Sequence, residues 1–370
     1  MGRAARAAVE RILGRADIRI GGDRPHDVSV HDERFFERLL RGGSLGAGEA
    51  YMDGWWDCAA LDEAIARVFR AGVLDLLPRD WPTLVTALRA RLFNLQRLRP
   101  SEVGEKHYDI GNALYEAMLD RRMIYSCGYW PSATTLEEAQ EAKLDLICRK
   151  LMLETGMQLL DIGSGWGGLM NFAAEHYGVQ ATGVTVSREQ AAWADGHKGA
   201  LPVETKVMDY MALTGRFERI VSVGMFEHVG YKNYRRFFEK VAALIEDDGI
   251  FLLHTISGNL TVKQPDPWFE KYIFPNSMLP SPRQIAEASE GLFVTEDLQN
   301  FGPDYDKTLM AWHANIESAW ERLLQFDERF RRMWRYYLLS MAGSFRARSI
   351  NLLQFVFSRR GLDVAYRSPR

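Results

Sequence analysis

The sequence predicts an α/β fold with a doubly wound, mostly parallel sheet, preceded by a small, mainly helical N-terminal domain. Three observations lead to this prediction. A short apolar strand at 157–162 runs into a glycine-rich turn and a helix, and five apolar segments in the second half of the chain alternate with helical segments. The length of 370 residues also exceeds the usual size of a single domain.

Apolar residues recur at helical spacing in the N-terminal part of the chain. We expect helices over 1–15, 33–41, 61–69 and 81–98. A glycine-rich stretch between the second and third of these contains Gly54-Trp55-Trp56-Asp57. Aromatic packing in a small core is one interpretation of this stretch, and a lipid-contacting surface is the other.

Pro100, Ser101 and Gly104 interrupt the helical pattern and indicate a boundary. We therefore place a small N-terminal domain over 1–95, a linker over 96–105 and the larger α/β domain over 106–370.

The larger domain is expected to open with residues 105–112, followed by a short helix, and to end, after residue 312, mainly in amphipathic helix. A helix over 136–151 is expected to lead into the glycine turn. After this helix, strands are predicted at 157–162, 179–185, 203–208, 219–223 and 250–256. In such a sheet the ligand site lies at the carboxyl ends of the strands. Polar residues gather at these ends, namely Asp209 and Tyr210 after the third strand, Glu227 after the fourth and His254 within the fifth.

The turn after the first strand reads Leu159-Leu160-Asp161-Ile162-Gly163-Ser164-Gly165-Trp166-Gly167-Gly168. Its glycines lack Cβ atoms, so backbone N–H groups and the helix N-terminus can approach a polar ligand. A dinucleotide fold would place Asp or Glu at the end of the second strand, but this strand ends at Thr185, with Gln190 nearby. The pattern Asp-x-Gly-x-Gly-x-Gly-Gly followed by Thr-x-Ser-x-x-Gln instead indicates S-adenosylmethionine (SAM) and a Rossmann-like methyltransferase fold.

Composition excludes several other classes of protein. The net charge of −3 argues against a nucleic-acid binder. Three scattered cysteines without C-x-x-C spacing indicate a reducing compartment and neither a disulfide framework nor a metal site. No apolar run is long enough for a signal peptide or a transmembrane helix, so we expect a cytoplasmic protein that meets a membrane only from its surface.

Six motifs together resemble the bacterial cyclopropane-fatty-acyl-phospholipid synthases of the mycolic acid cyclopropane synthase family. The resemblance extends from about residue 25 to residue 360. The motifs are His107–Asn112, Tyr125–Trp130, Leu160–Gly168, Val223–Gly230, Phe251–Ile256 and Phe345–Arg348.

This resemblance implies transfer of a methyl group from SAM to a cis double bond of a phospholipid acyl chain, with a bicarbonate ion taking the proton as the cyclopropane ring closes. The carbocation on this route must be kept from water and given one base. On the family's pattern the bicarbonate nest consists of Cys127, Glu227, His254, the backbone of Ile256 and Tyr305. The cofactor residues would be Tyr125, Ser126, Asp161, Gly163, Gly165, Gly167, Gly168, Thr185, Gln190, Asp209 and Tyr210.

Other readings remain open. Cys127 and His254 also fit ordinary buried core positions, and Tyr305 fits a loop aromatic. On the same scaffold, a methyltransferase would make methyl-branched or methylene acyl chains or methylate a small amine, and a non-catalytic homologue would only bind lipid. The expected partners are unsaturated phospholipid acyl chains at the membrane surface, and the N-terminal domain is a candidate for lipid engagement or for a homodimer contact.

Overall fold

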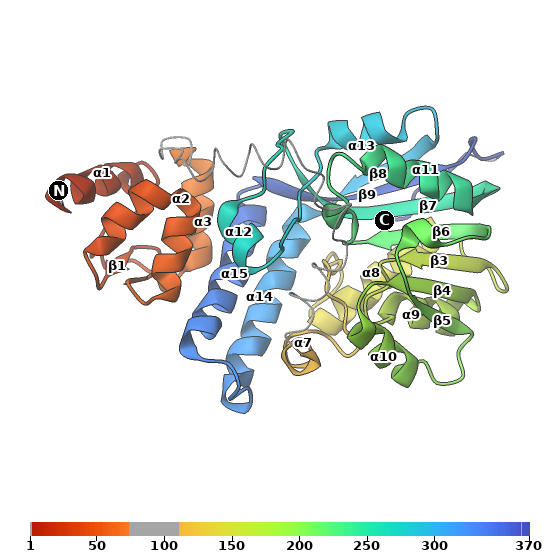
Figure 1. Cartoon of the computed structure of the whole chain (residues 1–370), viewed down its shortest axis with the longest axis horizontal. Coiled ribbons are helices and arrows are strands. Elements are labelled where there is room, and N and C mark those ends of the chain that lie inside the picture. The colour runs from red at the N-terminus through yellow and green to blue at the C-terminus, as the bar shows by residue number, and fades with distance from the viewer. Residues whose placement is uncertain (1, 74–110, 364) are drawn as a thin grey trace. The chain divides into compact units, whose positions relative to one another are not determined.

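The computed structural model describes residues 2–73, 111–363 and 365–370 (Figure 1). They form two compact units. The first comprises 2–73, Lys263–Pro275 and Tyr305–Ile350, and the second comprises 111–262, Asn276–Asp304 and the described residues of Asn351–Arg370. The predicted helix over 81–98, the predicted linker over 96–105 and residues 107–110 of the first motif lie outside the described residues.

The second unit is built on a seven-stranded sheet. Its strands are β3 (Gln158–Ile162), β4 (Gln180–Thr185), β5 (Val203–Val207), β6 (Phe217–Val223), β7 (Ile245–Gly258), β8 (Val294–Asn300) and β9 (Ile350–Ser358). They lie in the order β5-β4-β3-β6-β7-β9-β8. Strands β3 to β7 pair in parallel and β8 pairs antiparallel with β9, so the predicted doubly wound, mostly parallel fold is confirmed.

The five predicted strands correspond to β3 through β7, whereas β8 and β9 were not predicted. The sequence of β9 is an almost continuous apolar run that is buried along its length, in a region expected to be mainly helical. Such a run has no period that separates a buried strand from a buried helix. Strand β8 is short of apolar residues because it lies at the edge of the sheet.

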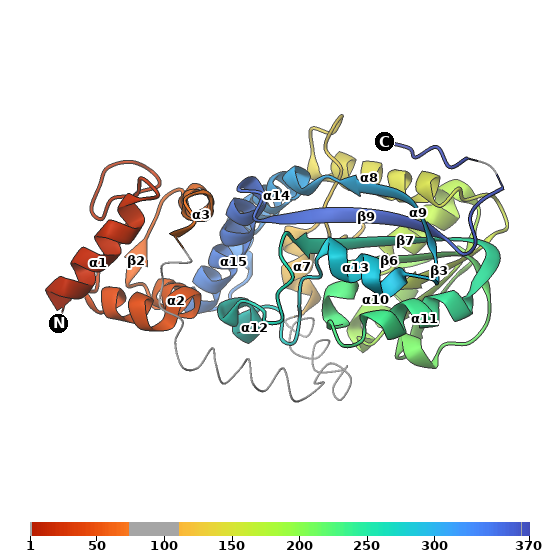
Figure 2. The same cartoon turned by 90° about the horizontal axis from the view of Figure 1, so that it is seen from above.

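Helices cover both faces of this sheet. Figure 2 shows α8 (Leu136–Lys150) and α9 (Gly168–Tyr177) along one side, with α11 (Tyr234–Leu244) and α13 (Pro282–Ser289) along the other. Successive strand residues alternate between the two cores, because Leu159 packs with α8 and α9 while Leu160 packs with α11 and α13. The unit also contains α7 (Asn112–Met118), α10 (Arg188–His197), η3 (Tyr210–Ala212) and η4 (Phe226–His228).

The parallel register aligns the carboxyl ends of the central strands at one edge of the sheet. Ile162 of β3 lies opposite Val184 of β4, and Val223 of β6 lies opposite His254 of β7. The segments that leave these strands therefore start close together, which is where this fold places its ligand.

The first unit is mainly helical. It contains α1 (Gly2–Gly14), β1 (Ser29–Val30), α2 (Arg34–Met52), β2 (Trp56–Asp57), α3 (Leu61–Arg70), α12 (Pro267–Tyr272), α14 (Gly302–Ala319) from Tyr305 on, η5 (Trp320–Arg322) and α15 (Glu328–Arg346). Its Trp56 is buried, with its ring 5.2 Å from that of Tyr51 and 6.4 Å from that of Tyr336 on α15. Trp56 of the Gly-Trp-Trp-Asp stretch thus belongs to an aromatic core. Within the described ranges, no helix combines the length and the apolar character needed to span a bilayer.

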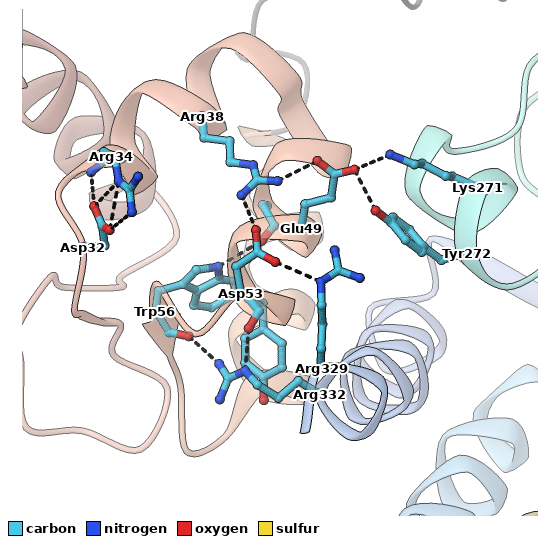
Figure 3. A network of polar contacts seen from close by, with 12 residues as sticks. Asp32, Arg34, Arg38, Glu49, Asp53, Trp56, Lys271, Tyr272, Arg329 and Arg332 are labelled. Atoms are coloured by element: carbon cyan, nitrogen blue, oxygen red, sulfur yellow. Dashed lines mark hydrogen bonds and ion pairs between the residues drawn. The ribbon is translucent and has the colours of Figure 1, made fainter. Parts of the chain in front are cut away.

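A polar network joins α2 to α12 and α15 within this unit (Figure 3). Glu49 on α2 accepts hydrogen bonds from Lys271 Nζ at 2.6 Å and from Tyr272 Oη at 2.8 Å. Asp53, one residue beyond α2, pairs with Arg329 on α15 at 3.0 Å. The predicted segment 106–370 is thus divided between the two units, because α12, most of α14 and all of α15 group with the N-terminal residues.

Candidate active site

The predicted glycine turn lines a cavity in the second unit. Gly163, directly after β3, has φ +89°, and a Cβ atom there would lie 2.6 Å from Cβ of Met225. Its N–H donates to the carbonyl of Val184 at 2.9 Å. Only glycine combines this backbone conformation with so close a neighbour, which explains the residue type at this position.

The cavity has a volume of about 410 Å³ and lies at the carboxyl ends of β3, β4 and β6. Gly167 does not line it, and a Cβ there would meet Ala194 Cβ of α10 at 3.1 Å, so this glycine allows close packing between helices. The other predicted cofactor residues all line the cavity, namely Tyr125, Ser126, Asp161, Gly163, Gly165, Gly168, Thr185, Gln190, Asp209 and Tyr210.

Short-range hydrogen bonds fix the polar groups on the β4 and β5 side of the cavity. The Thr185 hydroxyl donates to Gln190 Oε1 at 2.9 Å and thereby orients the side-chain amide of Gln190. Asp209 Oδ1 accepts the N–H of Met211 at 2.9 Å and begins the short helix η3. Tyr210 packs edge-on against Phe237, with ring centres 5.5 Å apart.

Asp161 and Lys143 are oppositely charged groups buried in the wall of this cavity. Lys143, on α8, is 1% exposed and donates to Ser126 Oγ at 2.8 Å. Burial raises the pKa of the Asp161 carboxyl to about 7 and lowers the pKa of the Lys143 ammonium to about 8. Asp161 Oδ1 has no hydrogen-bond partner among the residues that the structure describes.

Sequence reasoning missed Lys143. The signal that would have found it is its place on α8, because it falls on the same helical stripe as Leu136, Leu144 and Ile147, all of them buried. A lysine in the apolar stripe of an amphipathic helix is rarely buried without a function for its charge.

Glu227 and the backbone of Ile256, both predicted members of the nest, are in direct contact. The N–H of Ile256 donates to Glu227 Oε1 at 2.7 Å, while Glu227 Oε2 has no partner within the described part of the chain. Burial raises the pKa of the Glu227 carboxyl to about 7. A carboxyl group in this state exchanges a proton near neutral pH.

His254 lies two residues before Ile256 on β7, with its Nδ1 atom 3.1 Å from Gln354 Nε2. With the Gln354 amide in this orientation its nitrogen donates, so Nδ1 accepts and the proton of the neutral ring is on Nε2, which has no partner among the described residues. Burial, together with the charges of Lys143 and Lys150, holds the pKa of His254 well below its ordinary value. The imidazole is therefore a neutral N–H donor.

The other two predicted nest residues have different settings. Cys127 is fully buried in the second unit, and its thiol donates to the carbonyl of Gly128 at 3.1 Å. Tyr305 is part of the first unit, where its ring lies 4.6 Å from that of Phe345 and 5.9 Å from that of Trp312. The participation of Tyr305 in the nest stays a prediction.

We expect Gly163→Ala to weaken SAM binding by about 10- to 100-fold, because strain at positive φ and overlap with Met225 each cost on the order of 1 kcal/mol or more. Calorimetric titration with SAM measures the change. Gly178→Ala is the matched control, because Gly178 also has positive φ, at +67°, but ends α9 outside the cavity. An equal loss of affinity in both variants would show that the Gly163 effect is only a general loss of stability.

Comparisons with known proteins agree on one family. The family model described as mycolic acid cyclopropane synthetase matches residues 96–355. The chain is 52% identical over 359 residues to the cyclopropane-fatty-acyl-phospholipid synthase of Escherichia coli (strain K12), covering 96% of this chain and 94% of that protein. It is 32% identical over 352 residues to the tuberculostearic acid methyltransferase UfaA1 of Mycobacterium tuberculosis, covering 88% of this chain and 81% of that one.

A solved structure of similar fold is the mycolic acid cyclopropane synthase CmaA1 in complex with SAH and CTAB. It shares 34% identity, has a TM-score of 0.64 and covers 70% of this chain and 97% of its own.

Proposed function

The chain belongs to the mycolic acid cyclopropane synthetase family, and on that premise we propose that it cyclopropanates unsaturated acyl chains of membrane phospholipids. In this reaction the methyl(ene) group of SAM is added to a cis double bond. The observation that carries the proposal is the combination of the cavity with buried polar atoms, Glu227 Oε2 and His254 Nε2, that have no partner among the described residues.

The cavity suits SAM in size, charge and polarity. SAM supplies an electrophilic methyl group on a sulfonium, and its methionine end is a zwitterion. The unsatisfied carboxylate oxygen of Asp161 would accept from the ammonium of that end, and the backbone of Gly165 and Gly168, which lines the cavity, would face its polar atoms. Asp209 and Tyr210 would hold the adenosine part on the opposite side, as the family resemblance implies.

The nest would hold the bicarbonate ion that accepts the proton. His254 Nε2–H would donate to one oxygen of the anion, and protonated Glu227 would donate to another through Oε2. The Ile256 N–H fixes the Glu227 carboxyl in place, so its free oxygen cannot turn away. On the family pattern the set also includes the buried Cys127 and Tyr305.

A methyltransferase that produces methyl-branched chains is the second candidate function. It is favoured by the 32% identity to a relative named as a tuberculostearic acid methyltransferase. The two reactions share the cofactor and the double bond and differ in the fate of the cation. It closes a ring by losing a proton from the transferred methyl group, and it gives a branched chain by losing a proton from a chain carbon or by accepting a hydride from an added reductant. A nest that presents groups for a proton acceptor favours ring closure. Methylation of an amine would not need the nest.

We include in the proposal a cytoplasmic enzyme that associates transiently with the inner face of the membrane. The N-terminal domain would engage lipid or form a homodimer contact.

The test is an assay with methyl-labelled SAM and vesicles of unsaturated phospholipid, with and without added bicarbonate. Released fatty esters are analysed by mass and NMR. A bicarbonate-stimulated cyclopropane product supports the proposal. A methylene-branched product, which has the same mass as the ring and is told from it by NMR, supports the second candidate, as does a saturated branched product, two hydrogens heavier, when a hydride donor such as NADPH is added. Vesicles of fully saturated phospholipid are the control, and label transfer to neither kind of vesicle would overturn both.

A further inference from the structure

Lys143 carries a buried positive charge that no described carboxylate neutralises by contact. Its only hydrogen bond to a described residue goes to the Ser126 hydroxyl at 2.8 Å, and no described carboxylate oxygen lies within 4.0 Å of Nζ. Lys150, two turns later on α8, is equally buried but pairs with Asp297 at 3.2 Å and Gln299 at 2.6 Å. The two lysines therefore differ in their partners and not in their burial.

An unpaired ammonium is expensive to bury. The effective penalty for taking an ion out of water is several kcal/mol, and contact with one neutral hydroxyl offsets only part of it. Nevertheless, Lys143 is completely enclosed and lines the cavity. A charge kept in this position indicates that an anion comes to it when the site is in use.

Asp161 is not this anion. Because strand residues alternate between faces, Asp161 points, like Leu159, to the side of the sheet that α8 covers. Its carboxylate is near enough to attract Lys143 electrostatically but forms no ion pair with it. The cavity thus presents a cation and a carboxyl group that are held apart.

Ser126 transmits the charge of Lys143 into the cavity. Its Oγ accepts the Lys143 hydrogen bond, so the hydroxyl proton is directed to another acceptor. Its carbonyl is fixed by Gln140 Nε2 at 2.8 Å, and Gln140 lies on α8 like Lys143. A hydroxyl polarised by an ammonium is a strong donor to an oxyanion.

We propose that Lys143, acting through Ser126, is the positioning residue and counter-charge for a carboxylate-type oxyanion bound in this cavity. Two ligands carry this chemistry, namely the methionine carboxylate of SAM and a bicarbonate ion. The second source rests on the proposed function. Lys143 is placed to serve either, because it lines the cavity and its charge also reaches Cys127 and His254 of the nest.

The experiment compares Lys143→Met with Lys150→Met in the full chain. Calorimetry measures the affinity of each for SAM and for decarboxylated SAM, which differ only in the carboxylate. Turnover on unsaturated vesicles at saturating SAM then gives the half-saturating concentration of bicarbonate. The binding measurements need no turnover, so they remain informative if the enzyme proves to make another product.

A loss of SAM affinity of about 10- to 100-fold in Lys143→Met, with decarboxylated SAM little changed, would support the proposal and identify the cofactor carboxylate as the anion. Unchanged binding of both probes with a bicarbonate requirement raised at least about tenfold would support it and identify bicarbonate. Lys150→Met should show neither effect.

Equal weakening of both probes, or no change in binding or bicarbonate requirement, would overturn the proposal. If Lys143→Met does not fold, Ser126→Ala provides the same test. That variant keeps the cation and removes the donor, so a smaller but still carboxylate-selective loss is expected, and a non-selective loss would count against the proposal.

Discussion

Replacing Glu227 by alanine should lower the rate of cyclopropane formation by about 100- to 10,000-fold, the usual range for the loss of general base catalysis, because the bicarbonate that accepts the proton loses a hydrogen-bond donor, while SAM affinity stays nearly unchanged. SAM affinity should be unchanged because Glu227 contacts Ile256 on the nest side and does not line the cavity. Product formation by mass spectrometry and SAM binding by calorimetry check the two halves of this expectation separately.

Glu218→Gln is a matched control for substitution at Glu227. Glu218 also accepts a backbone N–H, that of Gln158 at 2.9 Å, but it lies near the start of β6, at the opposite end of the strand. This variant should retain its activity. A comparable loss in both variants would mean that the loss follows from removing a glutamate contact to the backbone and that Glu227 has no special role in the reaction.

The raised pKa of Glu227 gives this prediction a pH dependence with a definite sign. Below about pH 7 the carboxyl is protonated and can donate to bicarbonate, and above it the ionised group repels the anion. The half-saturating bicarbonate concentration, corrected for the CO₂ equilibrium, should therefore rise by up to about tenfold per pH unit above pH 7. In Glu227→Gln it should be flat, and a slope that survives this substitution would assign the titration to another group.

Within the second unit, some features could be predicted from the sequence and others could not. The turn around Gly163 depends on local backbone geometry, so the residue types predict it. The cavity-lining residues at the ends of β4 and β5 were singled out from local sequence as well, and their role in binding the cofactor stays a prediction. Strand β9 and the charge of Lys143 depend on tertiary surroundings. A buried apolar run has no readable period, and a helical lysine reveals its burial only when its neighbours on the stripe are compared.

The sequence could not predict which segments group into which unit, for a related reason. Trp268 on α12 is fully buried and lies so close to Gly48 of α2 that a Cβ there would be 2.3 Å from its ring. These residues are more than 200 positions apart, and the contact depends on shape complementarity, which has no local signature. Tyr305 shows the same limit, because the family pattern that includes it carries no information about the unit to which it belongs.

Asp161→Asn should weaken SAM binding by about 100-fold, because the ammonium of the methionine end loses a buried charged partner. It should also stabilise the ligand-free protein at alkaline pH. Burial raises the pKa of Asp161 from 3.8 to about 7, so the native state holds a proton that the unfolded state has already released between these values. The free energy of unfolding of the ligand-free protein is therefore highest below about pH 4. It falls by on the order of 4 kcal/mol as the pH rises to 7.

The Asp161→Asn variant has no ionisable group at this position, so its free energy of unfolding does not fall between pH 4 and pH 7 for this reason. Denaturant unfolding without SAM should therefore find it close to the wild type at pH 4 and more stable at pH 8. Asp145→Asn is the control, because Asp145 lies on α8 outside the cavity with its side chain 43% exposed, and its substitution should not make the ligand-free protein more stable at pH 8. If Asp161→Asn instead destabilises the ligand-free protein at pH 8, the Asp161 carboxylate is neutralised before SAM arrives. Lys143 would then already be engaged as its partner, and the separation of charges from which the anion site was inferred would be lost.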